Sequence, residues 1–309
     1  MMSQQDNELL TRCGPATAMG QLMRQYWVPT CLSSELKADG APVRIMLLGE
    51  KLVAFRDSTG RVGLMPHACP HRCASLFFGR NEENGLRCVY HGWKFDVDGN
   101  CLEMPNVPLH QQFSTKMKAK AYKTAERQGI VYAYLGEAAE APSLPEIEAL
   151  LLPQDDVVIR AHQRECNWLQ SLEGEIDTSH FGFLHAGSVR NEDVDPNNKH
   201  RFALLERAPE YYTAETDWGT MYAAYRPAGP GETYYRFSHF AFPFWTMFPD
   251  GDFEDNVVAQ AYVPMDDTHT MVFSVFYKRR APAMRRLKDG SPIPGLEPDA
   301  RQEPMQSGS

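Results

Sequence analysis

Two short segments of the chain each combine a cysteine with a histidine. Residues 69–71 read Cys-Pro-His, and residues 88–91 read Cys-Val-Tyr-His. Each segment places one thiolate and one imidazole on a tight loop, next to Pro70 or Gly92, so two such loops offer a metal two sulfur and two nitrogen ligands. A zinc site is the main alternative, but zinc fingers usually keep two cysteines on one arm and two histidines on the other.

The order Cys-x-His…Cys-x-x-His is the pattern of a Rieske [2Fe–2S] cluster. It predicts that Cys69 and Cys88 bind one iron and that His71 and His91 bind the other. Neutral imidazoles replace two anionic thiolates, so the potential of such a cluster rises to about −150 to +300 mV, against about −400 mV for an all-cysteine plant-type cluster.

The remaining cysteines do not indicate a disulfide scaffold. The chain has seven cysteines, an odd number, and shows no export signal, so metal binding or burial is the better expectation. Cys73 lies outside the cluster pattern and is expected to be a small buried residue. Trp93 is expected to shield the cluster from water, although a core position explains it equally well.

Residues 167–185, NWLQSLEGEIDTSHFGFLH, contain a second set of possible metal ligands. Asp177 and His180 are spaced to share one face of a helix. His185 would lie about 140° further round a regular helix, and the bend offered by Gly182 brings both rings to one metal. An amphipathic helix with two incidental histidines is the alternative. The upstream cluster favours the metal site, because electrons need an acceptor and a two-histidine, one-carboxylate iron activates oxygen.

Composition and charge limit the partners and the cellular location that are compatible with these sites. The 309 residues carry 31 Lys+Arg and 40 Asp+Glu, a formal charge of −9, without a basic stretch, which argues against nucleic acid as a main partner. The longest apolar runs, such as 149–152, are far shorter than the roughly 20 residues that a bilayer requires. Residues 1–10 show no signal peptide, so a cytoplasmic protein without membrane contact is expected.

Periodicity divides the chain into a β-rich first part and a mixed second part. We expect an N-terminal helix within 1–26, from the helical spacing of residues 14–27, then a small antiparallel β domain at 27–136 and a linker at 137–156. Residues 157–185 have helix-compatible spacing and open a second domain, 157–309, whose tail after Pro282 is expected to be extended or disordered. The β-like runs are 43–48, 52–55 and 129–135 in the first part, and 211–213, 221–225, 234–237, 257–263 and 270–275 in the second.

Four motifs together resemble the catalytic α subunits of Rieske non-haem iron ring-hydroxylating oxygenases, in particular phthalate dioxygenase-type oxygenases and dehydrodivanillate O-demethylases. They are MGQLMRQYWVP, LVAFRDSTGRVGLM, CPHRCASLFFGRNEENGLRCVYHGWKFDVDGN and NWLQSLEGEIDTSHFGFLH, and the resemblance extends from about Asn7 to about Pro292. It implies an α+β protein, in which an N-terminal all-β Rieske domain precedes a helix-grip catalytic domain of antiparallel sheet plus helices. It also implies a homo-oligomer, either a trimer or a multiple of trimers.

The same resemblance implies roles for the second constellation. His180 and His185 match the two ligands of a mononuclear Fe(II), and Asp177 matches the aspartate that joins the Rieske histidine of one subunit to an iron-ligand histidine of the next. The carboxylate ligand of the family lies well downstream of the second histidine. Asp299, in PDARQEP, is the only late candidate, and its proline-rich surroundings argue against a ligand helix. We therefore expect the sequence to stop before the third ligand and to hold the catalytic iron weakly.

The implied activity is that of the oxygenase component of a multicomponent system. A separate NAD(P)H-dependent flavin/iron–sulfur reductase supplies electrons, and O2 is activated at Fe(II) to dihydroxylate or O-demethylate an aromatic acid. Arg226 and Arg236 lie among aromatic residues and are candidates for bidentate contact with a substrate carboxylate. Asn167 is a further substrate candidate. The alternative is a Rieske-type electron-transfer protein without oxygenase activity of its own.

Overall fold

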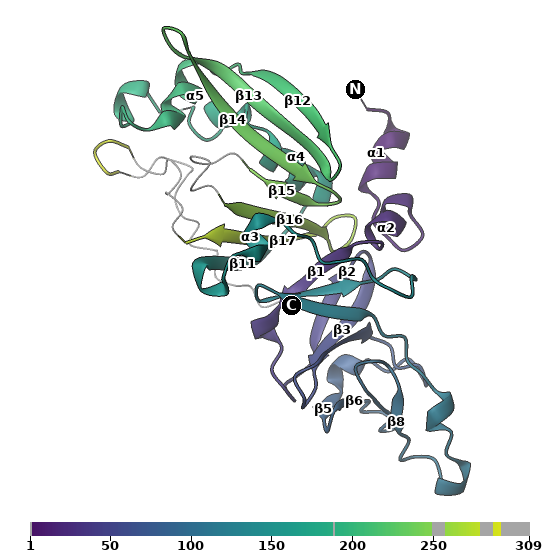
Figure 1. Ribbon diagram of the computed structural model, residues 1–309. Helices are drawn as coiled ribbons and strands as arrows, with labels where there is room; N and C mark the ends of the chain where they lie inside the picture. The colour runs from purple at the N-terminus through teal and green to yellow at the C-terminus, as the bar shows by residue number, and fades with distance from the viewer. Residues whose placement is uncertain (1, 188, 249–256, 279–286, 292–309) are drawn as a thin grey trace.

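The computed structural model describes residues 2–187, 189–248, 257–278 and 287–291. In these ranges the named strands form four antiparallel sheets, accompanied by short helices, which confirms the predicted α+β class. The molecule is elongated, with β5 to β8 at one end and β12 to β14 at the other (Figure 1). None of the helices in the described ranges has the length and apolar character that a bilayer crossing requires.

Three small sheets make up the N-terminal half. One has the order β1-β10-β9, formed by Trp27–Leu32, Ile130–Tyr134 and Lys123–Arg127. The next is β2-β3-β4, formed by Val43–Leu47, Glu50–Arg56 and Val62–Pro66. The third is β5-β6-β7-β8, formed by Arg80–Glu82, Gly85–Arg87, Lys94–Phe95 and Cys101–Glu103. The β2–β3 hairpin turns at Leu48 and Gly49, whose φ angles of 48° and 76° suit a tight two-residue turn.

A single seven-stranded sheet dominates the C-terminal half, in the order β11-β17-β16-β15-β14-β13-β12. In chain order its strands are Val157–Arg164, Glu210–Thr216, Gly219–Gly229, Glu232–Ala241, Trp245–Met247, Val258–Pro264 and Thr270–Tyr277. Helix α4, Trp168–Ile176, packs against β14, β15 and β16, and the short α5, Phe202–Leu205, packs against β13. Each β-like run predicted from the sequence lies in or overlaps one of the observed strands.

Two large hydrophobic cores hold these sheets. One runs without a break from the N-terminal helices through β1 and β10 into the seven-stranded sheet, and includes Met23, Tyr132, Leu150, Tyr262 and Phe273. The other lies between β3 and the β5–β8 sheet, and includes Phe55, Leu86 and Phe95 together with Cys69 and Cys88. The two cysteines of the predicted cluster are therefore core residues of the second core.

The N-terminal segment differs from the single helix that was predicted over 14–27. It contains two helices, α1 at Gln4–Thr11 and α2 at Ala18–Met23. Ser3 caps α1, and the Thr17 side chain caps α2 by accepting a hydrogen bond from the Gly20 N–H. Because the Thr17 cap fixes the start of α2 at residue 18, the residues from 14 to 17 form a turn instead of helix.

Two further segments depart from their predictions. Residues 157–164, grouped with a helical stretch, form strand β11, which pairs with β17 from Val157↔Tyr277 to Arg164↔Thr270. Short apolar segments do not separate helix from strand by spacing alone, and pairing with β17 decides this one. The expected linker 137–156 contains helix α3, Glu148–Leu151, whose Ala149 and Leu150 are buried in the larger core.

Candidate metal centres

The loop after β4 and the loop between β6 and β7 bring the four predicted cluster ligands together. The imidazole centroids of His71 and His91 lie 4.7 Å apart, and the thiols of Cys69 and Cys88 are buried next to each other. Backbone bonds fix both cysteines: the Cys69 N–H donates to the Ala74 carbonyl and the Cys88 N–H to the Trp93 carbonyl, each at 2.9 Å. The two sulfurs therefore lie in the hydrophobic core, and the two imidazoles lie at its partly exposed edge.

Gly92 is required where it stands. Its φ of +75° belongs to the left-handed region, and a Cβ at this position would lie 2.6 Å from the Cγ of Pro105. The Gly92 N–H donates to the Cys88 carbonyl at 3.0 Å, which closes the turn between the two ligands of this loop. A residue with a side chain would push the loop away from Pro105 and displace His91.

The donor set fits a [2Fe–2S] cluster of the Rieske type. Burial, together with the neighbouring Cys88 sulfur, raises the pKa of Cys69 to about 11, so this thiol needs an adjacent cation to ionise. Partial desolvation and the neighbouring His91 lower the pKa of His71, which favours the neutral ring that binds metal. One iron between the sulfurs and one at the imidazoles satisfies both requirements.

Trp93 is a core residue that also stacks on one of the imidazoles, so both interpretations of this tryptophan stay open. Its ring lies parallel to that of His71, with the centroids 4.2 Å apart, and its Nε1 donates to the Asn106 side chain at 2.8 Å. The prediction for Cys73 was wrong, because this cysteine is exposed. It lies at a positive φ of 56° in the turn after His71, which directs it away from the core.

The second centre lies on the loop that follows α4. The helix ends at Ile176, Asp177 is its C-cap, and His180 begins a single 3-10 turn. Asp177 and His180 therefore do not share the face of a regular helix, as the spacing had suggested. The loop still brings the rings of His180 and His185 together, with centroids 4.9 Å apart.

Asp177 is hydrogen-bonded within this loop. Its Oδ2 lies 3.3 Å from Nδ1 of His180, and its Oδ1 accepts from the Ser179 N–H at 2.8 Å. Partial burial opposes ionisation, but the bonds from Ser179 and the His180 ring outweigh it, so the pKa of Asp177 is lowered. Burial, and then the neighbouring His180, also lower the pKa of His185. The loop thus presents two neighbouring imidazoles beside one carboxylate that is already oriented.

The predicted third ligand cannot be placed. Asp299 lies outside the described residues, as does most of the tail after Pro282. Within the described ranges, no group of three or more histidine, cysteine, aspartate or glutamate side chains converges on one point that suits a single ion.

Both candidate arginines lie over the second centre. The register of β13 and β14 pairs Arg226 with Tyr234 and Arg236 with Ala224, so the two guanidinium groups project from the same face of the sheet. Arg236 lies 5.0 Å from the ring centroid of Phe181, and Phe181 contacts the His185 ring. Arg236 is therefore a neighbour of the histidine loop, and Arg226 lies beside Arg236 on the same sheet face.

Arg226 is the more unusual of the two arginines. Its side chain is nearly inaccessible, 2% exposed, and its Nη1 donates to the Glu206 carbonyl at 2.9 Å. Its Nε and Nη2 have no hydrogen-bond partner within the described chain. Burial, and then the charge of Arg236, lower its pKa. An anion beside these atoms would relieve both the missing bonds and the repulsion.

The sequence reasoning missed a tyrosine that positions the loop. The Tyr222 hydroxyl, from β13, donates to the carbonyl of Ile176, the last residue of α4. Strand alternation was the available signal, because residues 222, 224 and 226 must share one face. Tyr211 lies on the same face through its pairing with Ala224.

Asn167 has a structural role. Its Oδ1 caps α4 by accepting from the Leu169 N–H, and its Nδ2 donates to the carbonyls of Thr11 and Asp267. Both the oxygen and the nitrogen of this side-chain amide are hydrogen-bonded to the backbone, so we do not propose Asn167 as a substrate contact.

Comparison with known proteins places this geometry in a family. Residues 26–114 match the model of the Rieske [2Fe-2S] domain, and residues 133–286 match the "LigXa C-terminal domain like" model. A 3-chlorobenzoate-3,4-dioxygenase oxygenase subunit from Comamonas testosteroni is 49% identical, over 94% of this chain and 68% of that protein. A phthalate 4,5-dioxygenase oxygenase subunit from Pseudomonas putida is 40% identical, over 88% of this chain and 64% of that protein. The crystal structure of dicamba monooxygenase bound to dicamba superposes with a TM-score of 0.64 at 18% identity, covering 82% of this chain and 76% of that one, and this likeness shows the fold alone.

The chain belongs to the Rieske non-haem iron oxygenases, among the oxygenase subunits related to phthalate dioxygenase. The predicted enzyme class and the cofactor pair, a Rieske cluster and a mononuclear iron, are confirmed by this membership, and the alternative of a pure electron carrier is not supported. The chain spans about two thirds of the length of these curated relatives.

Proposed function

We propose that this chain is the oxygenase component of a multicomponent system that dihydroxylates or O-demethylates an aromatic acid. The substrate class is inferred from the buried side chain of Arg226. Its Nε and Nη2 have no hydrogen-bond partner within the described chain, so they can bind a carboxylate. Arg226 lies on the same sheet face as Arg236, next to the loop of His180 and His185. Both relatives named above act on aromatic carboxylates according to their names, 3-chlorobenzoate and phthalate.

Each side chain of the second centre then has a distinct task. His180 and His185 hold the mononuclear iron, which supplies O2 activation when it is bound. Arg226 and Arg236 orient the substrate by its carboxylate, and the Phe181 ring, next to Arg236, gives an apolar surface for a flat substrate. Tyr222 keeps the end of α4, and with it Asp177, in place.

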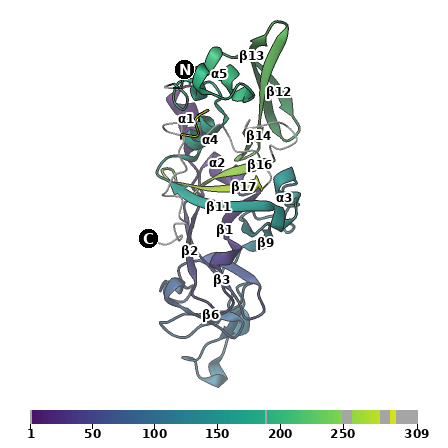
Figure 2. The same ribbon diagram turned by 90° about the vertical axis from the view of Figure 1, so that its left-hand side faces the viewer.

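Electron delivery in this proposal crosses between subunits. Within one chain the β5–β8 sheet beside the cluster loops and the helix α4 lie towards opposite ends of the molecule (Figure 2). Asp177 is 43% exposed and bonded to one histidine of its own loop, so its carboxylate is accessible to a second imidazole. Tyr90, beside His91, and Phe183 and Leu184, beside His185, are exposed apolar side chains that suit contact between subunits. A trimer or a multiple of trimers, supplied by a cytoplasmic flavin/iron–sulfur reductase, completes the proposal.

A substrate panel tests this function. The holoprotein, with a surrogate reductase and NADH, is offered benzoate-type carboxylates, methoxybenzoates and neutral methoxybenzenes, while O2 uptake and product are measured. We expect turnover of the carboxylates. Arg226→Gln should raise KM for a carboxylate at least tenfold and leave KM for a neutral aromatic unchanged, and Arg226→Lys should restore part of the loss. Equal KM changes for charged and neutral substrates would contradict the carboxylate contact.

A further inference from the structure

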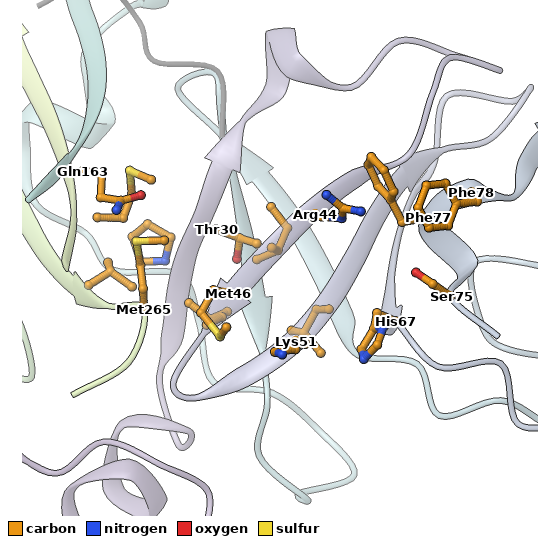
Figure 3. Close-up of a pocket in the computed structure, with 16 residues that line it drawn as sticks. Thr30, Arg44, Met46, Lys51, His67, Ser75, Phe77, Phe78, Gln163 and Met265 are labelled. Carbon is orange, nitrogen blue, oxygen red and sulfur yellow. The ribbon is translucent and has the colours of Figure 1, made fainter. Parts of the chain in front are cut away.

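A cavity lies where the β2–β3 hairpin meets the edge of the seven-stranded sheet (Figure 3). Its volume of about 560 Å³ is typical of a small-molecule site. β1, β2 and β3 line it from the N-terminal half, together with residues on either side of the first cluster loop. β11 and the β16–β17 hairpin line it from the C-terminal half through Gln163, Val263, Met265 and Met271.

The wall of this cavity is apolar. Ten of the sixteen lining residues are hydrophobic or proline, and they include Ile45, Met46, Leu52, Phe77, Met265 and Met271. Thr30, Ser75, Gln163 and the His67 imidazole add hydrogen-bonding groups. Methionine side chains adapt to the shape of a guest, and the phenylalanines offer aromatic surface.

The charge of the cavity is opposite to that of the protein. Arg44 and Lys51 line it and no lining residue is acidic, although the chain has 40 acidic residues against 31 basic ones. The Arg44 guanidinium lies 3.8 Å from the ring centroid of Phe77, so the cation is stacked on an aromatic face. Neither Arg44 nor Lys51 has an ion-pair partner in the part of the chain that the structure describes. Both cations are available to an anion.

We propose that this cavity is a binding site for an aromatic carboxylate, separate from the substrate site at the mononuclear iron. The carboxylate pairs with Arg44 and Lys51, and the ring lies against Phe77, Phe78 and Met46. Figure 3 shows Arg44 beside Phe77 and Phe78 at one end of the cavity, with Gln163 and Met265 at the other, so the proposed guest occupies the end that the N-terminal half forms. The inference does not depend on the proposed reaction.

The experiment is calorimetric titration of the holoprotein with 2-naphthoate. We expect two sites per chain if the proposed function is also right, and one site if only the present inference holds. The double variant Arg44→Gln, Lys51→Gln should weaken one site at least tenfold, and Arg226→Gln should affect only the other. Lys37→Gln, an exposed lysine outside the cavity, is the matched control and should change neither site. Met46→Trp, which fills the cavity but keeps its charge, should abolish the same site as the double variant.

Three results would overturn the inference. The first is the same number of sites and the same affinities in wild type and in the double variant. The second is tighter binding of decanoate than of 2-naphthoate, which would assign the cavity to an aliphatic chain. The third is a change of oligomeric state in the double variant without any loss of a naphthoate site, which would assign Arg44 and Lys51 to contact between copies of the chain.

Discussion

The indole of Trp93 lies flat on the imidazole of His71, with an interplanar angle of 2° and a centroid separation of 4.2 Å. The stacking covers one face of a cluster ligand and fixes the plane of its ring. The bond from the Trp93 Nε1 to Asn106 in turn fixes the indole. A ligand whose ring plane is set in advance presents its nitrogen in one direction only, so the residues around a metal ligand orient it for the metal.

Replacing His71 by cysteine is expected to keep a cluster and to lower its midpoint potential. A thiolate adds negative charge to the iron that the imidazoles bind, and moves the potential towards that of all-cysteine clusters, about −400 mV. A redox titration followed by visible absorption measures the change. Cys73→Ser, at an exposed cysteine outside the ligand set, is the control and should titrate like wild type. An unchanged midpoint potential in His71→Cys would contradict the assignment of this histidine as a ligand of the Rieske cluster.

Asp177→Asn is expected to leave both metals bound and to slow electron delivery severely. The amide keeps the shape of the side chain but loses the charge that couples its imidazole neighbours. Iron content and single-turnover transfer from the reduced cluster are measured together. Glu173→Gln, an exposed acid one turn before Asp177 on α4, is the matched control. Transfer at the wild-type rate in Asp177→Asn would exclude the bridging role.

His180→Ala is expected to remove one iron per chain and to leave the two irons of the cluster. The loss of one of two neighbouring imidazoles removes a ligand of the mononuclear metal without touching β5 to β8. Iron analysis after dialysis, together with the Rieske absorption, gives the count. Asp299→Ala, measured in parallel, identifies this aspartate as the third ligand if it too loses one iron. Loss of the cluster spectrum in His180→Ala would mean that the two centres are not independent.

Tyr222→Phe is expected to lower the free energy of unfolding by about 1 kcal/mol and to reduce turnover. The variant leaves the Ile176 carbonyl without its side-chain donor at the end of α4. Denaturant unfolding and coupled O2 uptake give the two quantities. Tyr212→Phe, at a tyrosine that is 71% exposed, is the control. Turnover equal to wild type in Tyr222→Phe would limit this hydroxyl to stability.

The His269 side chain is expected to make the stability of the β16–β17 hairpin depend on pH. Its Nδ1 lies 2.9 Å from Asp266 and its Nε2 lies 3.0 Å from Glu165, and the hydrogen bond with Asp266 is the main reason that its pKa is raised. A raised pKa in the folded state stabilises the fold fully below the ordinary histidine value of about 6.5, and this contribution is lost as the pH rises through the raised pKa. His269→Gln should therefore cost more stability at about pH 6 than at about pH 9, by less than about 1 kcal/mol because the pair is partly exposed. Thermal unfolding at the two pH values measures it, and an equal cost at both would contradict the ion pair.

The sequence was most informative where the residues of a site lie close together along the chain. The four proposed cluster ligands lie in two segments of three and four residues, so their types and order were enough to suggest a Rieske domain, which the match over residues 26–114 confirms. The loop after α4 was harder, because Ser179 and the Tyr222 hydroxyl decide its shape, and Tyr222 comes from a distant strand. Strand β11 was mistaken for helix because only its pairing with β17 identifies it.

The cavity beside the β2–β3 hairpin was invisible in the sequence for a related reason. Arg44 and Lys51 come from one hairpin, and Met265 and Met271 come from another more than two hundred residues later. Nothing in either segment marks it as half of a site. The same holds for Arg226, whose position between aromatics suggested a substrate contact while its burial depended on α5 and the adjoining loop.

The division of the interior into two hydrophobic cores affects the order in which parts of the protein unfold. Cys69 and Cys88 are part of the smaller core, whereas β1, β10 and the seven-stranded sheet share the larger one. Metal release is therefore expected to loosen the smaller core before the larger one, in the manner of a foldon. We expect chelation to speed hydrogen exchange at the amides of β5 to β8 first, while the larger core remains protected and unfolds later as one cooperative block.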